Sequence, residues 1–323
     1  MTSPALSVVI VSWNVRELLA RCLSSLFADL EASHLNARVI VVDNASRDGT
    51  PEMIRAQFPR VELIARDDNL GFAGGNNLGL RACGFDTNNA ALRPAACLLL
   101  NPDTEVCPGA IKTLLDTLYS HPDSAIVTSR LSYGDGSLQH SAFHFPGLGQ
   151  LYIDLFAVPG RFYESRWNGR YPRRLFEGSE PFEIDTPLGA VMLLRREAIE
   201  QVGIFDEGFA LYCEEIDWAA RFKEAGWKNL CAPTAHIIHH SGKSTSQVKV
   251  ESFVKLWTSR FRLHTKHPHF APLWLARRIV VAGMKRNMRG VDDAMKAACE
   301  NMIGLWNGPR RMTNDKAGRN SSD

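Results

Sequence analysis

Four short apolar segments in the first hundred residues constrain the fold of this chain more than any other feature of its sequence. They are residues 7–13 (SVVIVSW), 38–43 (RVIVVD), 61–65 (VELIA) and 96–101 (ACLLLN). Segments of helical character separate them, and Asn14 and Thr50 can cap two of these helices. Strands that are apolar along their whole length and alternate with helices are typical of a parallel sheet covered on both faces. The sequence therefore predicts an α/β fold.

The chain of 323 residues is longer than one typical domain. We expect an α/β domain over residues 1–245 and a basic helical extension over residues 246–323 with a disordered end. From Lys255 onward there are 14 Lys/Arg and 5 Asp/Glu, a balance of +9, so the rest of the chain carries about −7 of the total of +2. A basic extension can contact nucleic acid or an anionic membrane, or be a solvated surface. Residues 129–184 show weak periodicity and are predicted to be irregular.

The cysteines and the apolar segments point to a cytoplasmic location. The seven cysteines are odd in number and none forms a C-x-x-C motif, which predicts reduced, buried thiols. The first residues read as a strand, because they lack the charged region and the cleavage site of a signal peptide. No apolar segment approaches the roughly 20 residues that a membrane-spanning helix needs.

Two acidic residues stand where predicted strands end. Asp43 closes the second strand, and Asp103 follows the fourth in the stretch CLLLNPDTEV. Ligands of open α/β sheets bind beyond the carboxyl ends of the strands. One such acid could merely accept loop amides, but two on one edge of a sheet indicate a binding site.

A segment rich in glycine and asparagine lies between these two acids. It reads DDNLGFAGGNNLGL and includes Asn69, Gly71 and Asn76. Glycines allow a ligand to approach the backbone closely, and a helix that starts here favours an anion. The spacing matches neither a dinucleotide-binding fingerprint nor a P-loop, and an ordinary turn is the alternative.

Two further segments carry titratable side chains. In LYCEEIDWAARF, Glu214, Glu215 and Asp217 lie at the start of a helix, where they stabilise the helix dipole or include a general base. In HIIHHSGKST, strand alternation places His236 and His240 on one face and His239 on the other. A histidine in such a strand is either structural or a ligand. Residues 242–244 are predicted to form a mobile segment that closes over phosphates.

Six motifs in this order resemble glycosyltransferase family 2, especially its bacterial rhamnosyltransferase-like branch. They are SVVIVSWN, VIVVDNASRDGT, DNLGFAGGNNLG, LLLNPDTEV, GAVMLLRREAIEQVGIFDEGFALYCEEIDWAARFKEAGW and HHSGKS. The resemblance spans residues 7–244. It implies the GT-A fold, a Rossmann-like and mostly parallel sheet flanked by helices. It also implies a nucleotide-sugar donor, a divalent metal ion (Mg²⁺ or Mn²⁺) and inversion at the transferred sugar.

The resemblance also implies roles for single residues. Asp103 and His239 would bind the metal, with Asn101 in the place of the first acid of the D-x-D motif. Glu215 would be the catalytic base, where the family usually has Asp, and Glu214 and Asp217 lie beside it. Nucleotide-sugar binding falls on Asn14, Asp43, Asn69, Gly71, Asn76, Asn101 and Asp103. Gly189 and Ala190 fall on the acceptor-side loop.

The predicted function is an inverting glycosyltransferase that builds a cell-envelope glycan, with dTDP-L-rhamnose as a candidate donor and a glycan or lipid-linked acceptor. One alternative is a sugar-phosphate nucleotidyltransferase, but that class needs a Gly-rich basic loop after the first strand, where this chain has SWNVREL. Another is a glycan- or nucleotide-binding homologue without catalysis.

The basic extension mixes cations with aromatic residues. On a helical wheel Trp274, Val281, Met284 and Met288 share one side, with Arg278 beside them. One interpretation is an interfacial helix at the cytoplasmic face of an anionic membrane. The other is a helix packed on the catalytic domain. Nucleic-acid binding is not expected, because no recognition motif accompanies the charge.

Overall fold

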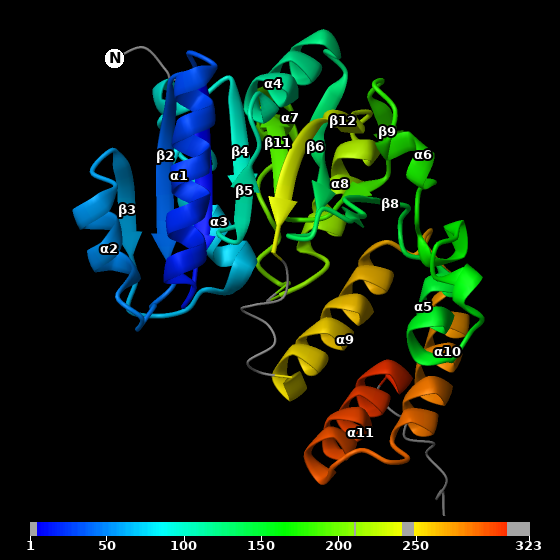
Figure 1. Ribbon diagram of the computed structural model, residues 1–323. Coiled ribbons are helices and arrows are strands. Elements are labelled where there is room, and N and C mark those ends of the chain that lie inside the picture. The colour runs from blue at the N-terminus through cyan, green and yellow to red at the C-terminus, as the bar shows by residue number, and fades with distance from the viewer. Residues whose placement is uncertain (1–4, 210, 241–248, 309–323) are drawn as a thin grey trace, which may run out of the picture.

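The computed structural model describes residues 5–209, 211–240 and 249–308, and its centre is one large mixed sheet. In order across the sheet, the strands are β3 (Val61–Ala65), β2 (Ala37–Asp43), β1 (Leu6–Ser12), β4 (Ala96–Leu100), β11 (Val191–Arg195), β6 (Ser124–Ser132), β12 (Lys228–His239) and β5 (Thr104–Val106). The strands β3, β2, β1 and β4 are parallel to one another, as the four apolar segments predict. Figure 1 shows them in blue and cyan on one side of the molecule.

The other half of the sheet mixes directions. β11 is antiparallel to both β4 and β6, β12 is parallel to β6, and β5 is antiparallel to β12. Short strands complete this half: β7 (Leu138–Gln139) pairs with β6, β9 (Phe182–Ile184) pairs with β12, and β8 (Ala142–Phe143) pairs with β10 (Thr186–Pro187). The segment 129–184, predicted to be irregular, is therefore partly regular. β6 is not recognisable from hydropathy because it contains the polar residues Thr128 and Ser129, both of which are buried. The Thr128 hydroxyl donates to the carbonyl of Val191 at 2.7 Å.

Helices cover both faces of the sheet, as expected. The helices of this domain are α1 (Arg16–Ala32), α2 (Thr50–Gln57), α3 (Gly71–Ala82), α4 (Ala110–Ser120), α6 (Arg173–Phe176), α7 (Arg196–Val202) and α8 (Glu214–Glu224). One core lies under α1, α2 and α4 and includes Leu23 and Leu114, and the other lies under α3, α7 and α8 and includes Leu80 and Trp218. The seven cysteines are unpaired, and six of them are buried.

Two helix starts differ from the prediction. Val15, not Asn14, precedes α1, because the Asn14 side chain instead accepts the backbone N–H of Arg47 at 2.8 Å. The second helix begins at Thr50 itself, after Gly49 in the left-handed region, and the Thr50 hydroxyl donates to Asp48 at 2.6 Å. Both side chains hold loops together and do not cap the helices.

The basic extension is helical, as predicted, but it does not form its core alone. It contains α9 (Lys249–Lys266), α10 (Leu273–Asn287) and α11 (Asp293–Asn307). These pack with α5 (Leu148–Leu155) of the central segment around Trp257, Met284 and Trp306 (Figure 1). At Gly283 a Cβ atom would lie 2.5 Å from the Cβ of Leu155, so α5 and α10 approach too closely for any larger residue. Within the described residues, no helix is long and apolar enough to cross a membrane.

Candidate active site

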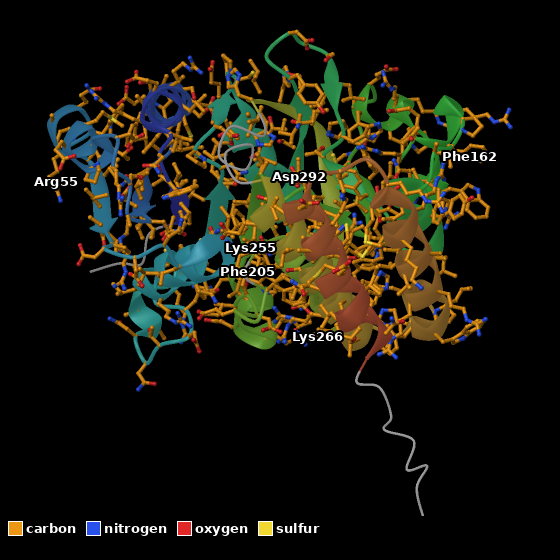
Figure 2. The ribbon with its side chains drawn as sticks, turned by 90° about the horizontal axis from the view of Figure 1, so that it is seen from below. Arg55, Phe162, Phe205, Lys255, Lys266 and Asp292 are labelled. Atoms are coloured by element: carbon orange, nitrogen blue, oxygen red, sulfur yellow. The ribbon has the colours of Figure 1, made fainter. Side chains whose placement is uncertain are left out.

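A cavity of about 720 Å³ lies where the strands β1, β4 and β12 end. The first turns of α3 and α8 and the start of α9 close its sides. The predicted residues that line it are Asn69, Gly71, Asn101, Asp103, Gly189, Ala190, Glu214, Glu215 and His239. The fold thus brings together residues from six of the sequence motifs. Lys255 of α9, which also lines the cavity, lies near the middle of the molecule in Figure 2, which views it from below.

Asp103 and His239 face each other at one side of the cavity. The Nε2 atom of His239 lies 3.2 Å from Oδ1 of Asp103, and both side chains are largely buried. The Nδ1 atom of His239 is 3.0 Å from Oε1 of Gln139, so Gln139 accepts the Nδ1 proton. With the proton on Nδ1, a neutral ring has its Nε2 lone pair available for a cation bound beside Asp103. A carboxylate oxygen and an imidazole nitrogen at about 3 Å can share one divalent cation with adjacent coordination positions.

The segment that carries Asp103 is fixed by backbone contacts. The N–H of Asn101 donates to the carbonyl of Ala190 at 2.9 Å, and the hydroxyl of Thr104 donates to the carbonyl of Asn101 at 2.8 Å. The backbone carbonyl of Asp103 accepts the N–H of His240 at 2.9 Å. The segment of Asn101 and Asp103 is therefore held against Ala190, and Asp103 is held against the end of β12.

Glu214 and Glu215 begin α8 after an unusual backbone turn. Tyr212 and Cys213 both lie in the left-handed region, at φ 68° each, which costs about 1–3 kcal/mol per residue. Such strain at the start of a helix directs the two carboxyl groups at the cavity wall. A Cβ atom on Gly189 would lie 3.7 Å from the side chain of Glu215, so this acid lies beside the acceptor-side loop.

Burial gives the carboxyl groups of Glu214 and Glu215 different pKa values. It raises the pKa of Glu215 to about 7. Burial, and then the nearby charge of Glu215, hold the pKa of Glu214 well above its usual range. Oε2 of Glu214 has no hydrogen-bond partner among the described residues. A carboxyl group that titrates near neutral pH suits a general base, whereas one that stays protonated does not.

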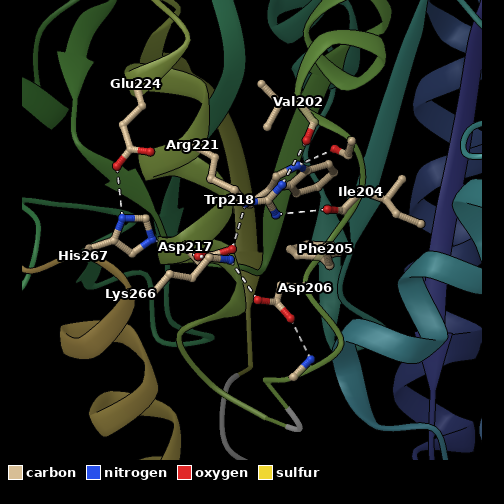
Figure 3. Close-up of polar contacts among 12 residues, drawn as sticks. Val202, Ile204, Phe205, Asp206, Asp217, Trp218, Arg221, Glu224, Lys266 and His267 are labelled. Carbon is tan, nitrogen blue, oxygen red and sulfur yellow. Dashed lines mark hydrogen bonds and ion pairs between the residues drawn. The ribbon is translucent and has the colours of Figure 1, made fainter.

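Asp217 belongs to a different constellation, which Figure 3 shows. Its side chain is fully buried and contacts Arg221 at 2.9 Å and Lys266 and His267 at 2.8 Å each. Burial alone would raise the pKa of Asp217, but the hydrogen bonds from His267 and Lys266 outweigh it and hold that pKa below its ordinary value. Asp217 does not line the cavity and instead joins α8 to the end of α9.

Three other predicted residues also lie outside the cavity lining. Asn14 bridges two loops, and the amide of Asn76 donates to the carbonyl of Phe72 within α3 at 3.0 Å. Asp43 is almost fully buried, with Oδ2 accepting the N–H of Ser46 at 3.0 Å and Oδ1 without a partner among the described residues. It directly precedes Asn44, which does line the cavity. The predicted mobile segment 242–244 lies outside the described residues.

The sequence did not predict several lining residues. They are Val11, Ser12, Trp13, Asn44, Leu70, Phe72, Pro102, Leu188, Leu211, Tyr212, Glu251, Ser252 and Lys255. Six of these thirteen directly adjoin a predicted residue, so the motifs already indicated where they lie: Trp13, Asn44, Leu70, Phe72, Pro102 and Leu188. The residues of α9 gave no such signal, because only the packing of the extension brings them to the strand ends. Oγ of Ser12 and Oδ1 of Asn44 are buried without a partner among the described residues, as expected where a polar ligand binds.

Comparisons with known proteins identify the family of this chain. Residues 7–203 match Glycosyl transferase family 2. The N-acetylglucosaminyl-diphospho-decaprenol L-rhamnosyltransferase of Mycobacterium tuberculosis is 32% identical over 246 residues, which cover 75% of this chain and 78% of that protein. A low-salt glycan biosynthesis hexosyltransferase of Haloferax volcanii is 24% identical over 67% of this chain and 61% of its own length.

Two solved structures share the fold. A mannosyltransferase from Pyrobaculum calidifontis, in complex with GDP-Man and Mn²⁺, has a TM-score of 0.54 at 14% identity and covers 94% of this chain and 81% of its own. GalNAc-T7 with UDP, GalNAc and Mn²⁺ has a TM-score of 0.58 at 14% identity, over 93% of this chain and 54% of its own. The predicted GT-A fold is confirmed. The chain belongs to glycosyltransferase family 2, within its rhamnosyltransferase-like branch, and is a nucleotide-sugar glycosyltransferase.

Proposed function

We propose that this protein transfers L-rhamnose, with inversion, from a nucleotide-sugar such as dTDP-L-rhamnose. The acceptor is a hydroxyl group of a sugar that is attached to a lipid through a diphosphate. The relative that is 32% identical carries such an activity in its name. The observation that carries the proposal is that Glu215 and the pair Asp103 and His239 line one cavity. The product would be a cell-envelope glycan.

The residues present fit a divalent cation. Asp103 and His239 would hold Mg²⁺ or Mn²⁺, and Gln139 already fixes the ring of His239 in the tautomer that such a role requires. When bound, the ion would neutralise charge on the leaving diphosphate. Asp43 and Asn44 each have one buried oxygen without a partner in the part of the chain that the structure describes, and these oxygens can accept N–H groups of a nucleobase.

Glu215 performs the proton transfer in this mechanism. Its carboxylate accepts the proton of the acceptor hydroxyl while the hydroxyl oxygen attacks the sugar from the face opposite the diphosphate. Glu214 stays protonated beside it, so the pair does not hold two buried negative charges at neutral pH. Gly189 leaves room next to Glu215 for the acceptor sugar.

A panel of nucleotide-sugar donors tests this proposal. The assay measures nucleotide release with Mg²⁺ or Mn²⁺ and a diphosphate-linked sugar acceptor. We expect turnover with a dTDP-linked donor. Absence of release with every donor and acceptor would favour the homologue that binds without catalysis.

The metal assignment has its own test. Asp103→Ala removes a carboxylate from a loop at a strand end, so we expect the fold to persist and metal-dependent turnover to be lost. Transfer at the wild-type rate by Asp103→Ala in the presence of Mn²⁺ would contradict the assignment.

We also propose that the helical extension contacts an anionic membrane at the cytoplasmic face. Met284 is buried and Val281 packs against the core of the extension, so of the face expected from the helical wheel it is the Trp274 end that is exposed. Trp274 is 60% exposed, with the guanidinium of Arg278 at 5.3 Å from its ring, and Trp167, packed on α5, is 69% exposed. Exposed tryptophans beside arginines are typical of side chains at a membrane interface.

A further inference from the structure

The extension forms part of the cavity wall. Glu251, Ser252 and Lys255 share one side of α9, and all three line the cavity that also contains Glu215. Further along α9, the hydroxyl of Ser259 donates to the carbonyl of Leu211 at 2.8 Å. α9 is therefore held against the segment that leads into Glu214 and Glu215.

Ion pairs fix the far end of α9 to the catalytic domain. Arg262 and Lys266 each contact Asp206 at 2.8 Å, and Lys266 and His267 contact the buried Asp217 at 2.8 Å (Figure 3). Because Asp217 is a residue of α8, the helix of the catalytic base and the helix of Lys255 are joined directly. The position of Lys255 in the cavity wall is thus set by the fold.

The charges in the cavity make Lys255 distinctive. Asp103, Glu214, Glu215 and Glu251 all line it, whereas Lys255 is the one Lys or Arg among the described lining residues. Its Nζ atom lies 2.6 Å from Oε1 of Glu251, and its side chain is 40% exposed. An ammonium group has three donors, so the contact with Glu251 leaves others for a ligand. An exposed i,i+4 ion pair contributes only about 0.3–0.5 kcal/mol to stability, which does not explain why a cation is placed here.

We infer that Lys255 binds a phosphate of the diphosphate that links the acceptor sugar to its lipid. This inference rests on the proposed function. The donor diphosphate belongs beside Asp103 and His239, at the ends of β4 and β12. α9 instead packs on Leu211, next to the helix whose Glu215 must contact the acceptor hydroxyl. A phosphate held on this side pairs with the donors of the ammonium group that the contact with Glu251 leaves free.

Kinetics with two matched acceptors test the inference on the full-length protein. One acceptor is a short-chain prenyl-diphospho-sugar, and the other is the same sugar on an alkyl chain without phosphate. We expect Lys255→Gln to raise KM for the diphosphate acceptor about tenfold, the effect of roughly 1.4 kcal/mol of binding energy. KM for the alkyl acceptor and for the donor should stay unchanged, and Lys255→Arg should keep most of the affinity.

Lys296→Gln is the matched control. Lys296 is similarly exposed and is also paired with an acid on its own helix, at 3.1 Å from Asp293, but it does not line the cavity. An equal rise in KM for both acceptors, or a rise for the donor alone, would overturn the inference.

A binding measurement separates the inference from the proposed function. Calorimetry with a short-chain prenyl diphosphate requires no turnover. Weaker binding of the prenyl diphosphate by Lys255→Gln than by the wild type supports the inference. If the wild type binds this ligand but transfers no sugar, the proposed function fails and the inference about Lys255 stands. Equal affinities of the wild type and Lys255→Gln overturn the inference.

Discussion

At the scale of single residues, the pair of carboxyl groups at the start of α8 carries the sharpest prediction. Glu215→Gln should reduce kcat about 10²–10⁴-fold, because an amide cannot accept the hydroxyl proton. Donor binding should be retained. Glu52→Gln, an exposed change on α2, is the control. An unchanged kcat for Glu215→Gln would exclude Glu215 as the base.

The raised pKa of Glu215 predicts how the rate depends on pH. The base is active when deprotonated, and the pKa of Glu215 is about 7. The value of kcat/KM should therefore rise with pH below about 7 and level off above it. Stopped assays in buffers of constant ionic strength would measure this profile, and a rate that is flat from pH 5.5 to 8.5 would contradict the assignment.

Gln139 shows what sequence motifs cannot supply at this scale. His239 was predicted from the family motif, but its partner Gln139 lies 100 positions earlier in the chain and on the short strand β7. We expect Gln139→Ala to weaken Mn²⁺ affinity about 10–100-fold, since a ligand without its outer partner loses its orientation. Calorimetric titration with Mn²⁺ would measure it, with Gln57→Ala at the exposed end of α2 as the control. Unchanged affinity would mean that Gln139 does not position His239.

At the scale of secondary-structure elements, the interlock between α8 and α9 depends on Asp217. Asp217→Asn keeps the shape but removes the negative charge that faces Arg221, Lys266 and His267. The free energy of unfolding should fall by about 3 kcal/mol at neutral pH, the lower end of the range for a broken buried pair, because Lys266 keeps Asp206 and His267 keeps Glu224 as partners. Urea unfolding measures the change, and Asp123→Asn, which affects an exposed pair with Lys228, should have little effect.

The loss of stability in Asp217→Asn should depend on pH. The pKa of Asp217 is lowered by folding, so its charge stabilises the protein above the ordinary carboxyl pKa, and this contribution is lost as the pH falls toward the lowered value. The difference between the wild type and Asp217→Asn should therefore shrink below about pH 4. Lost turnover at unchanged stability would instead support a catalytic role for Asp217.

The predicted elements succeeded where one physical signal decided them. The strands β1, β2 and β4 are apolar along most of their length and are largely buried, whereas the edge strand β3 contains Glu62 and is only partly buried. β6 was not predicted, because Thr128 and Ser129 interrupt its apolar residues, and the burial of Thr128 depends on its hydrogen bond to Val191, a tertiary contact. The choice among three acids on α8 likewise depended on Lys266 and His267, about 50 positions further along the chain.

At the scale of the whole molecule, the extension should bring the protein to membranes. We expect the full-length protein to sediment with anionic liposomes at low salt and to be released at high salt, because each Lys or Arg near the surface contributes about 1 kcal/mol. Combined Trp167→Ser and Trp274→Ser should weaken this binding, because both rings are exposed. Tyr119→Ser is the control, because it also removes an exposed aromatic ring, but from α4 of the catalytic domain.

Neutral liposomes provide the second control for membrane binding. Equal sedimentation with neutral and anionic liposomes would contradict the role of the cations. If the protein does not sediment with anionic liposomes at low salt, the proposed membrane role is wrong, and the extension serves only to complete the cavity wall.

The packing of α5 on α10 also determines when the protein becomes competent during its synthesis. The sheet strands β1 to β4 and their helices leave the ribosome early and can pair at once. Leu151 and Leu155 of α5 stay uncovered until α10 has emerged, and the cavity lacks one wall until α9 has done so. A nascent chain therefore contains Asp103, Gln139 and Glu215 before α9 is made and closes the cavity. A ribosome that stops before α9 would release a folded sheet with an open cavity and an exposed apolar helix, which is the kind of surface that chaperones and proteases recognise.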